Sequence, residues 1–101
     1  MKDQKEGIRI DLVKLWRTNT WIIVHLLGYK TSDLAKKVDV SRQLITTLFN
    51  NKYYRMTGIQ FLGLMEGMRE LMDEKRNLPE YEKAMKFYME IKEEYTKNGL
   101  H

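Results

Sequence analysis

The chain has 101 residues, a hydrophobic fraction of 43% and a formal net charge of +4. This length predicts one domain, and the hydrophobic fraction is large enough for a core, which argues against a disordered chain. The absence of cysteine excludes disulfide frameworks, thiolate metal sites and a cysteine nucleophile, and it fits a reducing compartment. No signal peptide is predicted, and the apolar run Trp21–Leu27 is too short for a bilayer, so we expect a cytoplasmic protein without membrane contact.

The positive charge is concentrated in one part of the chain. Residues 30–55 hold six basic and two acidic side chains, whereas residues 66–97 hold seven basic and nine acidic ones. Because basic clusters attract polyanions, residues 30–55 are a candidate nucleic-acid surface. Ordinary solvated lysines would give the same count, so charge alone leaves both interpretations open.

Apolar spacing and a single proline predict an all-α protein with five helical segments. Residues 1–7 are polar and are expected to form a flexible start. Residues 8–16 predict the first helix, although alternating apolar side chains at its beginning leave a short strand open. A cap within Thr18–Thr20 is expected to begin a separate helix, which Gly28 ends.

The middle of the chain predicts two short helices. The first runs from Thr31 or Ser32 to Val38, and a tight turn at residues 39–40 leads to the second. The second helix is expected to be capped by the serine that begins the segment Ser41–Asn50. The spacing of its apolar residues predicts that this second helix has one apolar and one polar face.

On a wheel of 100° per residue, one face of this second helix is apolar. Its core-facing residues are Leu44, Ile45 and Leu48. The opposite side carries Arg42, Gln43, Thr46 and Asn50, with Thr47 on the flank. Two short helices with a tight turn and a polar outer face are typical of a helix-turn-helix, whose second helix enters the major groove. Arginine can bond guanine O6 and N7, glutamine adenine N6 and N7, and threonine can contact a thymine methyl.

Several polar residues around the two helices are candidates for phosphate contacts, which fix the register on DNA without reading sequence. Four of them follow the second helix: Lys52, Tyr53, Tyr54 and Arg55. Ser32 and Lys36 in the first helix are further candidates.

The stretch GYKTSDLAKKVDVSRQLITTLFNNKYYR resembles the motif of the XRE (Cro/CI-like phage repressor) family. The positions that match in register are Gly28, Leu34, Ala35, Lys37, Val38, Val40, Ser41, Ile45, Leu48, Asn50 and Lys52. The resemblance covers Thr18 to Met72 and implies a lambda-repressor-like helix-turn-helix bundle (motif 31–50), here with an additional C-terminal helix. In that family, the residues at the positions of Ser41, Arg42, Gln43 and Thr47 read bases. Those at the positions of Thr31, Asn50 and Lys52 touch the DNA backbone. Thr46 is a further candidate for base contact because of its place on the helical wheel, and the resemblance does not imply it.

The chain departs from the family pattern at four places. Asp39 replaces the turn glycine, and Asn51 replaces the glycine after the second helix; both residue types tolerate the left-handed conformation. Lys30 stands where threonine or serine caps the first motif helix, so the cap is expected to shift to one of the next two residues. Phe49 replaces a frequent glutamate and is expected to pack on a neighbouring segment, with contact to DNA as the alternative.

A long helix is expected from Thr57, its cap, to about Arg76. Its inward side chains are predicted to be Ile59, Leu62, Met65, Met68 or Leu64, Leu71 and Met72. Gly63 and Gly67 share one face and lower helix stability, so they predict close approach of another backbone. The helix around Trp21 or a second subunit would supply that backbone.

The last helix carries an apolar stripe of its own. Pro79 suits the first turn of a helix and marks a boundary between residues 8–77 and 78–101. The stripe consists of Tyr81, Met85, Tyr88, Ile91 and Tyr95. Because a domain over residues 8–77 leaves few core positions for it, the stripe is expected to pair two subunits. Folding back on its own chain is the alternative.

No arrangement for catalysis is present in the sequence. It contains no nucleophile–base pair, no phosphate-binding glycine loop and no cluster of ligands at metal spacing, so we expect no enzyme activity, metal or cofactor. His25 is expected to be a partly buried residue with its hydrogen bonds satisfied.

These patterns predict a sequence-specific transcriptional regulator that binds double-stranded DNA. It would be a small dimeric phage-type or mobile-element repressor that reads a pseudo-palindromic operator through the major groove. The alternative is a protein-interaction module on a helix-turn-helix scaffold, such as an antitoxin, an anti-defence inhibitor or a sequestering regulator with a protein partner.

Overall fold

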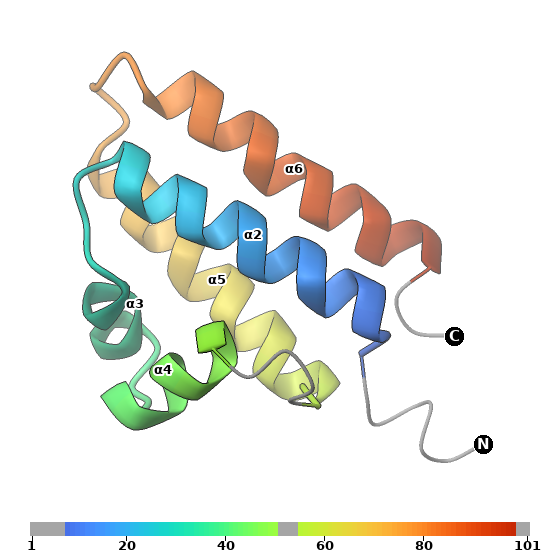
Figure 1. Ribbon diagram of the computed structural model, residues 1–101. Helices are drawn as coiled ribbons and strands as arrows, with labels where there is room; N and C mark the ends of the chain where they lie inside the picture. The colour runs from blue at the N-terminus through green and yellow to red at the C-terminus, as the bar shows by residue number, and fades with distance from the viewer. Residues whose placement is uncertain (1–7, 51–54, 99–101) are drawn as a thin grey trace.

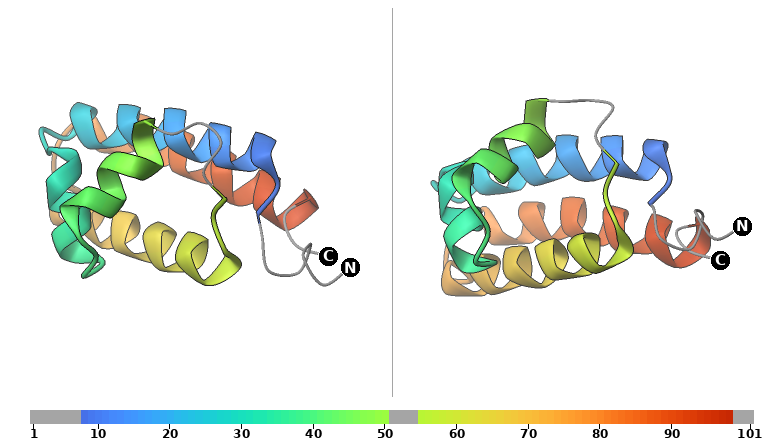
Figure 2. Two further views of the ribbon diagram at one scale, coloured as in Figure 1. Left: turned by 60° about the horizontal axis from the view of Figure 1, so that its bottom comes forward. Right: turned by 90° about the horizontal axis from the view of Figure 1, so that it is seen from below.

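The computed structural model describes residues 8–50 and 55–98, and every element in these ranges is an α-helix. The elements are α2 (Ile10–Leu26), α3 (Thr31–Lys37), α4 (Arg42–Asn50), α5 (Gly58–Glu74) and α6 (Tyr81–Asn98) (Figure 1). The long helices α2, α5 and α6 lie side by side, with α6 antiparallel to the other two (Figure 2). The all-α prediction is confirmed. No helix in the described ranges is long and apolar enough to cross a membrane.

The two helices predicted before Gly28 are one continuous helix, α2. The capping residues expected at Thr18–Thr20 therefore lie in mid-helix, and the strand alternative is not adopted. Asn19 is buried, and its Nδ2 donates to the Phe87 carbonyl oxygen at 3.0 Å and to Glu90 Oε1 at 2.8 Å. Because α6 supplies both acceptors, Asn19 has no need of the local backbone bonds that would end a helix.

Several helix ends lie where local signals predict them. Gly28 adopts a φ of +81° just past α2, and the following Tyr29 N–H donates back to the Val24 carbonyl oxygen at 2.8 Å. At the start of α5, Thr57 Oγ1 accepts from the Gln60 backbone N–H at 3.1 Å. The start of α6 differs from the prediction. Pro79 was expected in the first turn of this helix, but the helix begins two residues after the proline.

The stripe expected to pair subunits instead covers the core of its own chain. Tyr88 and Ile91 are buried, and the other stripe residues, Tyr81, Met85 and Tyr95, pack half-buried against the same core. That core also contains Trp16 from α2 and Phe61 from α5. The structure thus shows the folding-back alternative, and residues 78–80 connect two helices of one core.

The inward face of α5 differs from the predicted one. Ile59 and Leu62 are exposed, and Phe61, which was not predicted to face inward, is buried. Leu64, predicted as the alternative to Met68, is buried together with it. The remaining predicted positions, Met65, Met68, Leu71 and Met72, are buried. The apolar residues of α5 are consistent with two overlapping stripes, and packing against the neighbouring helices decides between them.

The two glycines of α5 have different surroundings. A Cβ placed on Gly67 would collide with the Val38 side chain at the end of α3. The neighbour that needs this glycine is therefore a side chain of α3 and not the backbone of the helix around Trp21. Gly63 is exposed, and a Cβ there would meet nothing within 4 Å.

Candidate nucleic-acid interface

Helix α4 presents the two faces that its spacing predicts. Ile45 and Leu48 are buried, and Leu44 is half-buried against the same core. The exposed side chains are Arg42, Gln43, Thr46 and Asn50, with Thr47 half-buried on the flank. The polar face of α4 therefore points away from the molecule.

The turn before α4 fixes how this helix leaves α3. Asp39 has a φ of +57°, as predicted for the residue that replaces the turn glycine. The Val40 N–H donates to the Ala35 carbonyl oxygen at 3.0 Å, which closes the end of α3. Ser41 Oγ then accepts from the Leu44 N–H at 3.0 Å, so the predicted serine cap is confirmed.

Helix α3 contributes three of the predicted phosphate contacts. Lys30 occupies its N-cap position, and its backbone N–H donates to Asp33 Oδ2 at 2.8 Å, so the predicted shift of the cap to the next two residues is wrong. Thr31 and Ser32 lie half-buried in the first turn, and Lys36 is exposed. The Asp33 carboxylate thus makes the half of a capping box in which the side chain three residues into the helix accepts from the N-cap N–H.

The two threonine hydroxyls of α4 are bonded within the helix. Thr46 Oγ1 donates to the Arg42 carbonyl oxygen at 2.9 Å, and Thr47 Oγ1 donates to the Gln43 carbonyl oxygen at 3.0 Å. Each hydroxyl has one hydrogen, and both hydrogens are used in this way. Thr46 consequently offers an outside partner only its methyl group and the lone pairs of its oxygen.

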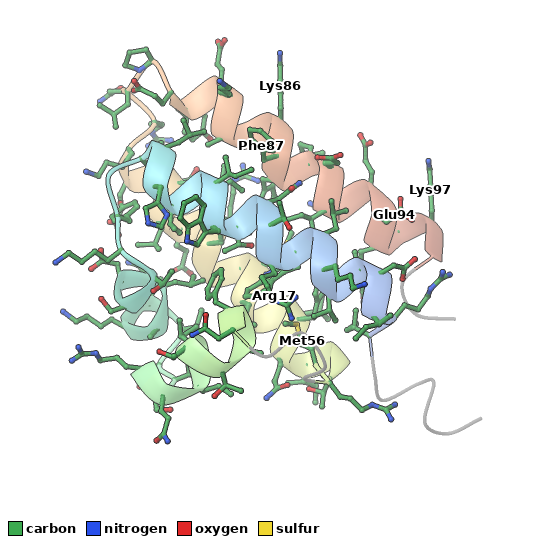
Figure 3. The ribbon with its side chains drawn as sticks, viewed as in Figure 1. Arg17, Met56, Lys86, Phe87, Glu94 and Lys97 are labelled. Carbon is green, nitrogen blue, oxygen red and sulfur yellow. The ribbon has the colours of Figure 1, made fainter. Side chains whose placement is uncertain are left out.

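Two contacts tie the last turn of α4 to α2, and the sequence predicted the packing of Phe49 but not the bond from Arg17. Arg17 Nε donates to the Leu48 carbonyl oxygen at 2.9 Å, and Figure 3 shows Arg17 beside the end of α4. The Phe49 ring packs on Trp16 with 5.3 Å between centroids, so the predicted packing role of Phe49 is confirmed. No local signal in the sequence identifies the partner of Arg17, because Leu48 lies 31 residues away.

A groove of about 610 Å³ runs between α2, α3 and α4. Its lining is Arg17, Thr18, Trp21, Ile22, Thr31, Thr46, Phe49 and Asn50. Trp21, which is 52% exposed, thus shares one groove with three of the predicted DNA contacts, Thr31, Thr46 and Asn50. The sequence places Trp21 in an apolar helical run and predicts no functional role for it.

A polar cluster joins α3 to the end of α5. Lys37 Nζ lies 2.6 Å from Glu74 Oε2, and the Tyr29 hydroxyl lies 3.0 Å from Glu74 Oε1 and 2.9 Å from the Leu71 carbonyl oxygen. The Lys37 contact lowers the pKa of Glu74 below its ordinary value. Burial, followed by the bond to Glu74, raises the pKa of Tyr29 to about 12. The Lys37–Glu74 ion pair thus links α3 to the end of α5, beside the packing of Val38 on Gly67.

The remaining predicted residues fall into two groups. Arg55 is exposed at the end of the connection between α4 and α5. Lys52, Tyr53 and Tyr54, together with the helix stop expected at Asn51, lie outside the described residues.

His25 is exposed, contrary to the prediction of a partly buried residue. Its ring stacks on Trp21 with 4.1 Å between centroids, and its Nδ1 lies 2.8 Å from the Trp21 carbonyl oxygen. Within residues 8–50 and 55–98, no group of His, Asp and Glu side chains is arranged to hold a metal ion.

Residues 30–50 and 55 expose more basic than acidic side chains. Lys30, Lys36, Arg42 and Arg55 are exposed, whereas one of the two acids in the same stretch, Asp33, is bound to the N-cap of α3.

Comparison with protein families, with curated proteins and with solved structures finds no match to this chain. A function is therefore assigned from the arrangement of these residues alone.

Proposed function

We propose that this chain binds double-stranded DNA sequence-specifically, with α3 and α4 acting as a helix-turn-helix, and that it represses transcription. The observation that carries the proposal is the outward polar face of α4, where Arg42, Gln43 and Thr46 are exposed on a helix whose other side is buried. An α-helix about 10–12 Å across fits the major groove, which is about 12 Å wide.

Each exposed side chain of α4 has a base that suits its chemistry. The Arg42 guanidinium can donate two parallel bonds to guanine O6 and N7, and the Gln43 amide can do the same at adenine N6 and N7. Thr46, whose hydroxyl hydrogen is bonded to a carbonyl, is suited to a thymine methyl or to the amino group of adenine or cytosine. Ser41 is in the first place the helix cap, with base contact as its second role.

Residues beside this face would hold the phosphates. Lys36, Asn50 and Arg55 are exposed, and Thr31 lies in the groove next to α4. The sequence adds Ser32, Lys52, Tyr53 and Tyr54 to this set. Repression is the simplest consequence, because a bound protein that covers a promoter excludes polymerase without any further surface.

Selection of bound sequences from a random DNA pool at near-physiological salt tests the proposal. We expect one enriched motif whose positions respond to single substitutions on α4. Arg42→Ala and Gln43→Ala should each relax preference at one base pair, at a cost of about 1–3 kcal/mol. Lys36→Ala should weaken binding to all sequences alike and reduce the salt slope by about 1.

Lys86→Ala is the matched control, because Lys86 is an exposed lysine on α6, far from α4 (Figure 3). It should leave both affinity and sequence preference unchanged. A chain that enriches no motif, or whose α4 variants bind DNA as the wild type does, would contradict the proposal.

A further inference from the structure

The outer face of α5 exposes apolar side chains that the fold leaves uncovered. Ile59 is 87% exposed and Leu62 is 50% exposed. At 100° per residue these two side chains share one side of α5 with Gly63 and Glu66, within about 100° of each other. Leu62 also borders a groove of about 380 Å³ between α5 and α6. The walls of this groove are Phe61, Met65, Glu66, Arg69, Tyr88, Lys92, Tyr95 and Thr96.

We propose that this face of α5 binds a second copy of the chain, with the two α5 helices crossing antiparallel near Leu62 and Gly63. In such a crossing, Leu62 of one copy lies over Gly63 of the other, where no Cβ obstructs it. The space above Gly63 is open, since a Cβ there meets nothing within 4 Å. A glycine inside a helix lowers stability relative to alanine. Because the chain itself does not use that space, a two-fold contact accounts for both the glycine and the exposed leucine.

The charges at the rim of the groove suit a second copy better than a partner of one charge. Glu66 on α5 and Lys92 on α6 are both exposed, and neither forms an ion pair with another described residue. A two-fold axis applies each contact twice, so the glutamate of one copy can meet the lysine of the other in both directions. A strongly acidic or basic partner would be attracted by one of these charges and repelled by the other.

The need for two copies rests on the proposed function, because a pseudo-palindromic operator has two half-sites. The exposed residues of α5 that form this surface do not depend on that function. Tyr88 and Ile91 of the apolar stripe of α6 are buried against the core of the same chain, so these two side chains are not available to a second copy. Two exposed side chains and a groove rim make a contact smaller than the ~800 Å² per partner of a standard interface. The dimer should accordingly dissociate in the micromolar range and be strengthened by DNA.

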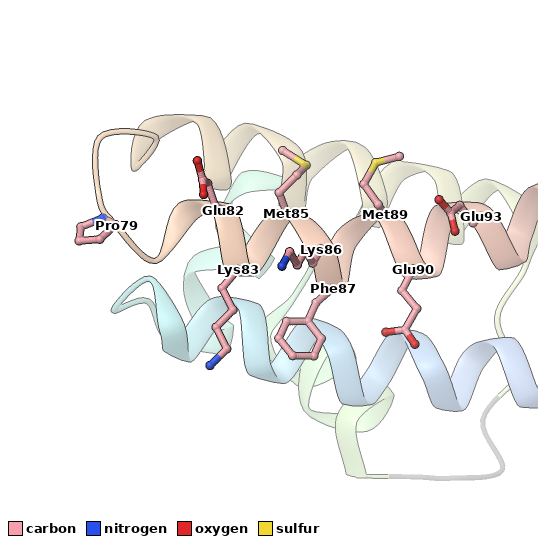
Figure 4. Close-up of a pocket in the computed structure, with 9 residues that line it drawn as sticks. All are labelled: Pro79, Glu82, Lys83, Met85, Lys86, Phe87, Met89, Glu90 and Glu93. Atoms are coloured by element: carbon pink, nitrogen blue, oxygen red, sulfur yellow. The ribbon is translucent and has the colours of Figure 1, made fainter.

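The outer face of α6 is the competing surface (Figure 4). Met85 and Met89 project on the same side of this helix, with Glu82, Lys86 and Glu93 along it. Met89 is 37% exposed, which makes it a matched site for introducing a charge outside the α5 face.

Sedimentation equilibrium of the full chain without DNA tests the proposal. Wild type should pass from monomer to dimer as its concentration rises. Leu62→Glu should raise the dimer dissociation constant about tenfold or more, whereas Met89→Glu should leave it unchanged. Gly63→Ala should also weaken the dimer, while raising the thermal midpoint of the dilute monomer because alanine favours the helix. A general loss of folding cannot produce those two opposite changes.

Two results would overturn the α5 interface. One is a wild-type chain that stays monomeric up to about 1 mM. The other is a dimer that Leu62→Glu leaves intact, and disruption by Met89→Glu alone would assign the contact to α6. Since these measurements contain no DNA, a chain that dimerises through α5 but enriches no DNA motif would refute the proposed function and leave the interface standing.

Discussion

Arg17 Nε lies 2.9 Å from the carbonyl oxygen of Leu48 and so joins the middle of α2 to the last turn of α4. Carbonyl groups in the last turn of a helix have no partner within that helix, and they carry the negative end of its dipole. The Arg17 guanidinium donates a hydrogen bond to one of these carbonyl groups, and its positive charge offsets the negative end of the dipole. This contact sets the far end of the proposed recognition helix, while the turn at Asp39 sets its beginning.

Arg17→Ala should lower the free energy of unfolding by about 1.5–3 kcal/mol, because a part-buried carbonyl loses a charged donor. Urea unfolding followed by circular dichroism measures the change. Lys14→Ala on the same helix, where the side chain is exposed, should stay within about 0.5 kcal/mol of wild type. DNA affinity should also fall in Arg17→Ala, measured well below the unfolding midpoint. Equal stability of the two variants would show that the contact does not hold α4.

Alanine at the two glycines of α5 should have opposite effects. Gly67→Ala should destabilise the fold by about 1–3 kcal/mol, since the new Cβ collides with Val38 and displaces the end of α3. Gly63→Ala should stabilise the monomer by about 0.5–1 kcal/mol, because its Cβ has open space. Thermal unfolding at low protein concentration compares them, and a shift of the same sign in both would contradict the packing of α3 on α5.

Acid should weaken the wild-type fold partly through Glu74. The contact with Lys37 lowers the pKa of Glu74 from its ordinary 4.5 in the folded state. A lowered pKa means that the ionised carboxylate contributes stability above about pH 4.5, and that this contribution disappears as the pH falls through the folded value. Glu74→Gln should therefore lose less stability than wild type between about pH 6 and pH 3. Urea unfolding across this range checks it, and parallel curves for the two proteins would contradict it.

Trp21 should report DNA binding by its fluorescence. Trp16 is fully buried, whereas Trp21 is 52% exposed in the groove beside Thr46 and Asn50. DNA against α4 would cover that groove and remove water from the indole, which shifts emission to shorter wavelengths. Trp21→Phe should abolish the shift and leave the emission of Trp16 as it was. An unchanged shift in this variant would place DNA elsewhere on the molecule.

Local signals predicted the parts of the candidate site that local interactions decide. Asp39 takes the left-handed conformation, Ser41 caps α4 and Gly28 follows α2, because each depends on residues within one turn. The division of α4 into a buried and an exposed side also followed from periodicity, since Ile45 and Leu48 had no alternative face. Base reading by the exposed side stays a prediction.

The wrong predictions concern residues whose structure is determined by contacts with distant parts of the chain. Asn19 looked like a helix cap, but its partners Phe87 and Glu90 are 68 and 71 residues away, on α6. The inward face of α5 was likewise chosen by tertiary packing, which buries Phe61 and exposes Ile59. A single sequence contains both stripes of α5 and does not say which neighbour each will meet. The partner of Arg17, 31 residues away, was out of reach for the same reason.

The packing of α6 on α2 has a consequence for synthesis and turnover. The first and last described helices cover one another, so a nascent chain leaves Trp16 and its neighbours without their final cover until α6 has emerged from the ribosome. Until then, the growing polypeptide presents an apolar surface that chaperones recognise. A single cleavage in the exposed turn at residues 78–80 would remove the covalent link between α5 and α6, so that α6 would stay on the core by packing alone. Proteolysis of this turn would therefore weaken the core at a point distant from the helix proposed to read DNA.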